Sequence, residues 1–105
     1  MEFLKYKFVV FVPVSHADIV REAMAESGAG IIGNYSHCSF STKGFGRFKP
    51  LEGAHPTIGD VGNIEIVEEE RVETVCEASR LQTIVEAVKA VHPYEEVAFD
   101  IYPLC

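Results

Sequence analysis

The chain has 105 residues, which suits one small domain covering residues 1–105 with a single core. Its 16 Asp and Glu outnumber nine Lys and Arg, so the formal net charge is −7. This charge argues against nucleic acid and anionic membranes as partners, because phosphate binding needs a basic surface.

The N-terminal third predicts a strand followed by a helix. Leu4–Val14 is rich in β-branched and aromatic residues, as expected for a central strand. Ser15 is the predicted N-cap of a helix, and Gly28 is expected to end it in a left-handed conformation. The apolar stripe of this helix is Ala17, Val20, Ala23 and Met24.

The middle third reads as strands and a long loop. Ile31–Ser41 is predicted as the second strand, and Lys43–Phe48 as a turn with a return strand, an extra hairpin. Pro50–Gly62 is a loop, and its length favours a functional role. Asn63–Cys76 is the third strand, either continuous or interrupted near Glu68–Glu70.

The C-terminal third predicts a second helix and a last strand. Ser79 and Gln82 form a capping box, and Pro93 ends the helix. Val97–Tyr102 alternates as a strand. The helix shows the strongest apolar periodicity in the chain, at Leu81, Ile84, Val85, Val88 and Val91.

The order of these elements predicts an α+β fold, a ferredoxin-like βαββαβ sandwich with both helices on one face of an antiparallel sheet. The first and last strands should be neighbours, so that the two ends of the chain lie close together. A domain of this shape can be inserted into a larger protein.

Two motifs invite a functional interpretation that their context does not support. The glycines of Gly28–Gly33 match a dinucleotide fingerprint, but they leave a helix and open a strand, the reverse of a true one. Cys38, Cys76 and Cys105 match no zinc spacing and are expected to be reduced thiols. A membrane span needs about 18 apolar residues, and no apolar run of the sequence approaches that length. The expected location is the cytoplasm.

The polar residues leave two interpretations open. His37, His55, His92 and Glu95 can converge on a divalent metal such as zinc, copper or nickel, although none of them forms a tight ligand pair. Each also has a structural alternative, such as His92 bonding the end of its helix. A run of acids is expected to form a solvated face: Glu65, Glu68, Glu69, Glu70, Glu73 and Glu77.

Several motifs together resemble a known family, the Nif-three-like proteins, also described as GTP cyclohydrolase I type 2 homologues. The resemblance is to their small insert domain, which is similar in fold to CutA and PII signalling proteins, and it covers nearly the whole chain. The motifs are Tyr35-x-x-Cys38-x-Phe40, Gly44-x-Gly46-x-Phe48-x-Pro50, Pro56-x-Ile58-Gly59, Glu68-x-x-Arg71-Val72-Glu73 and His92-Pro93-Tyr94-Glu95-Glu96-Val97-Ala98-Phe99-Asp100.

The resemblance implies a stand-alone form of the insert, without the two lobes that hold a dinuclear metal site in the larger family. It also implies self-association, commonly as a trimer, with ligands bound in clefts between subunits. We therefore expect a non-catalytic regulatory or binding module. Lys43, Arg47 and Tyr94 would bind a small anionic ligand. A small metal-dependent hydrolase and an accessory subunit of a two-lobed metal enzyme are the alternatives.

Overall fold

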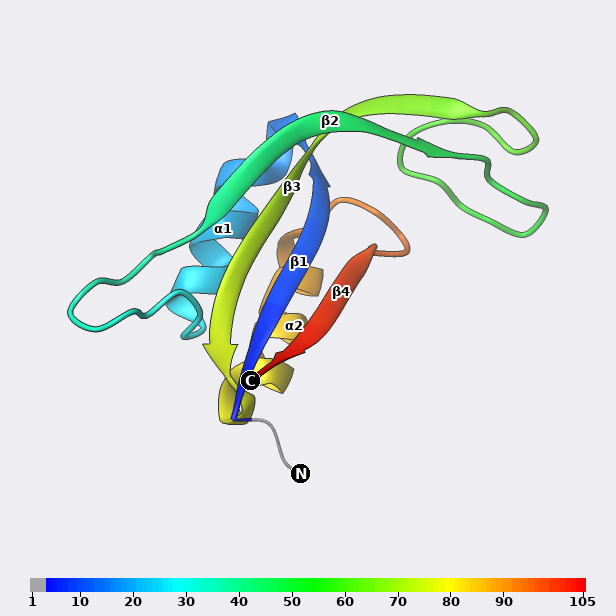
Figure 1. Ribbon diagram of the computed structural model, residues 1–105. Coiled ribbons are helices and arrows are strands. Elements are labelled where there is room, and N and C mark those ends of the chain that lie inside the picture. Colours follow the sequence, from blue (N-terminus) through cyan, green and yellow to red (C-terminus); the bar gives the residue numbers. More distant parts are fainter. Residues whose placement is uncertain (1–3) are drawn as a thin grey trace.

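Four antiparallel strands form one sheet in the order β2-β3-β1-β4. The structure is a computed structural model that describes residues 4–105. Helices α1 (Ala17–Glu26) and α2 (Leu81–Val91) pack against each other on one face of the sheet (Figure 1). This confirms the predicted ferredoxin-like α+β fold. The strands are β1 (Lys5–Pro13), β2 (Phe40–Phe48), β3 (Glu65–Glu77) and β4 (Phe99–Leu104).

The core lies between the sheet and the two helices. Alternate residues of β1, namely Phe8, Val10 and Val12, are fully buried against the helices. The predicted stripes meet them, with Val20 of α1 and Val88 of α2 also fully buried. Burying each such side chain stabilises the fold by about 2 kcal/mol. None of the helices within residues 4–105 is long and apolar enough to cross a membrane.

The helices begin later than their serines predict. A short 3-10 turn precedes each helix, η1 (Val14–His16) before α1 and η2 (Ala78–Arg80) before α2. The turns place Ser15 and Ser79 ahead of the first α-helical residues, and neither serine caps its helix. The predicted caps are therefore wrong.

The predicted helix ends are confirmed. Gly28 has a φ of 108°, and Ala29 N–H donates to the carbonyl of Met24 to close the end of α1. His92 is extended, with φ −73° and ψ 137°, as the residue before Pro93 must be.

The predicted strand Ile31–Ser41 is wrong, because β2 begins only at Phe40. Residues 28–39 instead form a loop closed by a hydrogen bond from Cys38 N–H to the Gly30 carbonyl. Gly30, Gly33 and His37 have φ values of 78°, 57° and 61°, which lie outside the range of a regular β-strand.

The predicted hairpin at Lys43–Phe48 is also wrong. These residues continue β2, and their register against β3 is unbroken from Phe40↔Glu73 to Phe48↔Glu65. β3 is likewise continuous through Glu68–Glu70, so the interrupted alternative is wrong.

The far ends of β2 and β3 extend beyond the rest of the sheet. Together with the loop between them they form an arm, residues 44–69 (Figure 1). The molecule is accordingly elongated, 46 × 28 × 21 Å. The turn that follows α2, residues 92–98, lies below the arm and leads into β4 (Figure 1). We call it the corner.

Candidate ligand pocket and metal centre

A pocket of about 480 Å³ lies where the arm meets the corner. The end of β2, the long loop and the corner all contribute to its lining, together with Phe11 and Glu69. Its apolar lining comprises Phe11, Phe48, Pro50, Ala54, Pro56, Ile58 and Ala98, and its polar lining includes Arg47, Lys49, Thr57, Glu69, Tyr94, Glu95 and Glu96. Apolar walls with polar groups that converge on them are typical of small-molecule sites.

Two hydrogen bonds fasten the long loop to the corner. The backbone N–H of His55 donates to the Glu95 carboxylate at 3.1 and 3.3 Å. The Thr57 hydroxyl donates to the Pro93 carbonyl at 2.7 Å. These bonds hold one wall of the pocket against the other, although the segments are about forty residues apart in sequence.

His92 anchors the corner from behind the pocket. It is 7% exposed, and its Nε2 lies 2.8 Å from the Phe11 carbonyl while its Nδ1 accepts the Tyr94 N–H. A carbonyl only accepts and an N–H only donates, so the ring is neutral with its proton on Nε2. Burial lowers the pKa of His92, against an opposing effect of the Phe11 hydrogen bond.

Tyr94 connects the corner to the arm. Its hydroxyl donates to Oε2 of Glu69 at 2.7 Å, and its ring packs against that of Phe48. Burial raises the pKa of Tyr94, and the Glu69 hydrogen bond raises it further, so the phenol stays protonated at neutral pH.

The structure separates the predicted site residues. Arg47, Tyr94 and Glu95 all line the pocket, whereas Lys43 pairs opposite Glu70 on β2 and is not part of the lining. Both ring nitrogens of His92 are engaged by backbone groups, and His55 contacts Glu95 through its backbone. His37 belongs to the 28–39 loop, at the end of the molecule opposite the arm (Figure 1).

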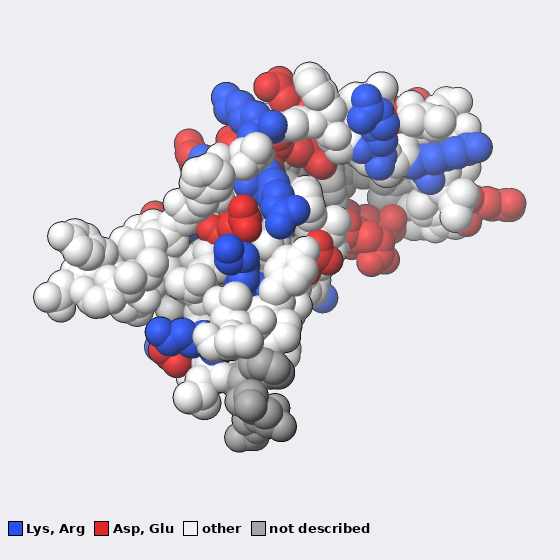
Figure 2. Space-filling model, in the orientation of Figure 1, with Lys and Arg blue, Asp and Glu red and all other residues white. Residues whose placement is uncertain are grey.

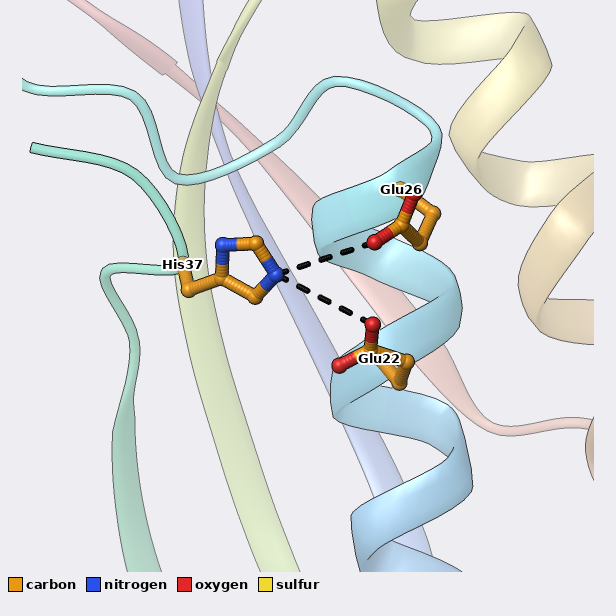
Figure 3. A group of neighbouring side chains, drawn as sticks. All are labelled: Glu22, Glu26 and His37. Carbon is orange, nitrogen blue, oxygen red and sulfur yellow. Dashed lines mark ion pairs between the residues drawn. The ribbon is translucent and has the colours of Figure 1, made fainter.

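His37 instead lies beside two glutamates of α1. Its Nε2 is 3.9 Å from Oε1 of Glu22 and 3.8 Å from Oε1 of Glu26 (Figure 3). Within residues 4–105 these three form the single group of three or more metal-capable side chains whose ligand atoms lie within 4.8 Å of one another. Tetrahedral zinc ligands lie about 3.4 Å apart, so small side-chain rotations suffice to hold an ion.

The two glutamates were missed by the sequence interpretation. Residues four apart on a helix share one face, and this spacing in Glu22 and Glu26 was the available signal. A second cavity, of about 360 Å³, adjoins the group and is lined by Asp18, Arg21, Glu22, His37, Cys38 and Thr74 among others.

Two acids of the predicted solvated face are buried. Glu69 and Glu70 are 8% and 7% exposed, so the prediction is wrong for them. Glu70 faces the helix layer, where Arg21 donates to it at 2.6 Å. On the open face of the sheet, basic and acidic side chains are interspersed (Figure 2), as in the ion pairs of Glu73 with Lys7 and Arg71.

Comparison with solved structures first defines the class of the fold. The periplasmic divalent cation tolerance protein CutA from Archaeoglobus fulgidus superposes with a TM-score of 0.71 over 96% of this chain and 84% of its own, at 16% identity. A Bacillus cereus protein related to NIF3 superposes with a TM-score of 0.84 over 97% of this chain, at 51% identity, and the match covers 26% of that protein. The chain is thus a CutA-like α+β domain.

Sequence comparison then places it more narrowly. A GTP cyclohydrolase 1 type 2 homologue from Halalkalibacterium halodurans is 54% identical over 99 residues, which are 94% of this chain. The chain spans about a quarter of that relative, 27% of its length. No protein-family model matches the chain. Its predicted resemblance to the insert domain of the Nif-three-like GTP cyclohydrolase 1 type 2 homologues is confirmed.

Proposed function

We propose that the chain is a non-catalytic binding module whose small ligand occupies the pocket between arm and corner. The observation that carries this proposal is the convergence of three separate chain segments on a pocket of about 480 Å³, fastened by the His55–Glu95 and Thr57–Pro93 hydrogen bonds. A volume of this size admits a ligand of metabolite dimensions.

Arg47 borders the pocket at the end of β2. It pairs opposite Ile66, so its side chain leaves the strand on the other face from Gly46 and Phe48, and it meets an acidic group of the ligand at the rim of the pocket. Its guanidinium presents N–H donors in a fork that matches a carboxylate or phosphate. Phe48 and the ring of Tyr94 offer flat apolar surface inside the pocket. Lys43 lies outside the lining, so its contribution is confined to long-range charge.

The test is an NMR titration of the chain with phenylacetate, an anion with a flat apolar body. We expect shifts concentrated in the pocket residues, lost in Arg47→Ala and retained in the matched control Lys43→Ala. Equal binding by wild type and Arg47→Ala would remove the proposed anion contact. Native mass spectrometry of untreated protein reports whether a small species co-purifies.

Self-association is the second part of the proposal, with a trimer as the expected form. The helix-side face of the arm supports it. Phe45, Ile64 and Ile66 are 67%, 70% and 55% exposed there, and β2 is an edge strand of the sheet. Exposed apolar side chains beside a free strand edge commonly mark contact surfaces.

Light scattering after gel filtration tests this part. We expect a mass of more than one subunit for the wild type and of one subunit for Phe45→Ser/Ile66→Ser. A wild type that stays monomeric at high concentration contradicts the proposal.

The cytoplasm remains the expected location.

Divalent metal binding is a second candidate function, supported by the Glu22, Glu26 and His37 group. Three protein ligands leave one tetrahedral position open, as a metal-dependent hydrolase requires. Calorimetric titration with Zn²⁺ should show a site that is lost in His37→Ala and kept in His55→Ala. Loss in His55→Ala alone would move the site to the long loop. Turnover of nucleotides by the zinc-loaded chain, absent in His37→Ala, would favour the hydrolase.

A further inference from the structure

Two neighbouring glutamates of β3 are buried, but they differ in how their charge is compensated. Glu70 pairs with the guanidinium of Arg21 at 2.6 Å. Glu69, 8% exposed, forms no salt bridge with any of residues 4–105, and the Tyr94 hydroxyl is the one donor that it receives from them. A carboxylate withdrawn from water is costly unless cationic or N–H donors replace the lost hydration.

The free oxygen of Glu69 lies at a place that a glycine keeps open. Tyr94 occupies Oε2. Oε1 receives no hydrogen bond from the described residues and keeps contact with solvent, because none of their fully buried side-chain oxygens is unpaired. A Cβ on Gly46 would overlap Oε1, so the carboxylate rests directly against the β2 backbone. Both residues border the pocket. The wall of this cavity therefore carries a carboxylate that receives one hydroxyl hydrogen bond and forms no salt bridge with residues 4–105.

The charges around the pocket point the same way. Acidic side chains gather in the space between the arm and the body (Figure 2). Glu95 and Glu96 border the pocket with Glu69, against two basic residues, Arg47 and Lys49. Acids are thus in excess, while the walls carry the apolar rings of Phe11, Phe48 and Tyr94.

We propose that the pocket binds a small organic cation through Glu69, a protonated amine attached to a flat apolar body. The inference rests on the proposed function and completes it: an amine that meets Glu69 and an acidic group that meets Arg47 describe a small zwitterion. The amine donates to Oε1 while Tyr94 continues to donate to Oε2. The apolar body packs against the aromatic walls.

The test is an NMR titration of the full chain with 2-phenylethylamine, its uncharged N-acetyl derivative and phenylacetate. Ligands of this size bind with dissociation constants of about 1 mM. We expect the amine to shift resonances of the pocket residues and the N-acetyl derivative to bind at least about tenfold more weakly, a loss of about 1.4 kcal/mol. Equal binding of the two, or no shift with the amine, overturns the inference.

A pair of variants assigns the effect to Glu69. Glu69→Gln keeps an acceptor for Tyr94 and removes the charge, and it should reduce amine binding at least about tenfold. Glu68→Gln removes the same charge from the preceding residue of β3, which lies outside the pocket lining. This control variant should bind the amine as the wild type does. Unchanged amine binding in Glu69→Gln contradicts the proposal. Should that variant fail to fold, the wild-type comparison of amine and N-acetyl derivative still decides.

The third probe separates this inference from the proposed function. Pocket shifts with phenylacetate but none with the amine would keep the binding module and its Arg47 contact, and would reject a cationic ligand. No pocket shift with either probe would reject both.

Discussion

The imidazole of His92 donates its Nε2 hydrogen to the carbonyl oxygen of Phe11, 2.8 Å away, and so joins the corner to β1. The ring is neutral in this arrangement, because Nδ1 accepts the Tyr94 N–H. Burial lowers the pKa of His92. An unfolded histidine takes up a proton at about pH 6.5, where the folded one stays neutral.

Stability should therefore fall on acidification. Below about pH 6.5 the unfolded state binds this proton and the folded state does not, so the free energy of unfolding decreases until the pH reaches the folded pKa. The measurement is urea unfolding of the wild type and His92→Gln between about pH 7.5 and 5.5. The other titrating groups cancel in the difference between the two proteins. If the difference in free energy of unfolding between the two proteins does not change with pH, His92 is not the cause of the acid destabilisation.

Gly46→Ala should destabilise the chain and disturb the pocket. The new methyl group overlaps Oε1 of Glu69, which must move and weaken its bond to Tyr94. We expect a loss of about 1–3 kcal/mol, as is usual for overpacking. Gly44→Ala is the matched control on the same strand, because no atom lies within 4 Å of its Cβ position. Equal melting temperatures of the two variants would contradict this account of Gly46.

Gly30→Ala should be more damaging than Gly33→Ala. Both glycines have positive φ, but a Cβ on Gly30 would lie 2.5 Å from the Cys38 carbonyl oxygen, whereas nothing lies within 4 Å of that on Gly33. The Gly33 change costs about 1 kcal/mol for the left-handed backbone. The Gly30 change adds a backbone clash, and we expect more than about 3 kcal/mol by urea unfolding. Similar losses of stability in the two variants would show that the positive φ alone, and not the clash with Cys38, causes the destabilisation.

Removing Arg21 alone should destabilise the chain more than removing both Arg21 and the charge of Glu70. Arg21→Met leaves the buried Glu70 carboxylate without its cation, which we expect to lower the free energy of unfolding by about 2–3 kcal/mol. The double variant Arg21→Met/Glu70→Gln should recover part of that loss, because no isolated charge remains. Thermal or urea unfolding measures both. A double variant less stable than Arg21→Met would mean that the charge of Glu70 is itself stabilising.

The elements with strong periodicity could be predicted from sequence. The apolar stripes of the two helices, through Val20 and Val88, and the apolar run Phe8–Val12 of β1 each specify a buried face. Two helices with four strands in this order leave few topologies. Pro93 and Gly28 act through local backbone sterics, so the helix ends followed directly from residue type.

The segment from Ile31 to Phe48 could not be predicted in the same way. A glycine considered alone signals a turn, and for this reason Gly44 and Gly46 predict a hairpin. In the structure Gly46 leaves room for the carboxylate of Glu69, a residue 23 positions later in the sequence. His37 adopts a positive φ that its residue type does not announce.

The candidate site could be predicted from the sequence only in part. The three segments that border the pocket were each marked by their composition, and Arg47, Tyr94 and Glu95 among them line it. Burial of Glu69 and Glu70 could not be foreseen, because a run of three glutamates ordinarily faces water. Glu70 is paired by Arg21 and Glu69 is hydrogen-bonded by Tyr94. Both partners are distant in sequence, and only the tertiary structure brings them close.

The pairing of β1 with β4 determines how the domain responds to mechanical force. Lys5 lies opposite Leu104 at one end of this antiparallel pair, so tension applied to the two ends of the chain pulls across the strands. The hydrogen bonds of an antiparallel ladder run perpendicular to the strands, and they would open one after another, as in a zipper. A stretching experiment should therefore peel β4 away at low force before the core of β1, β3 and the helices yields.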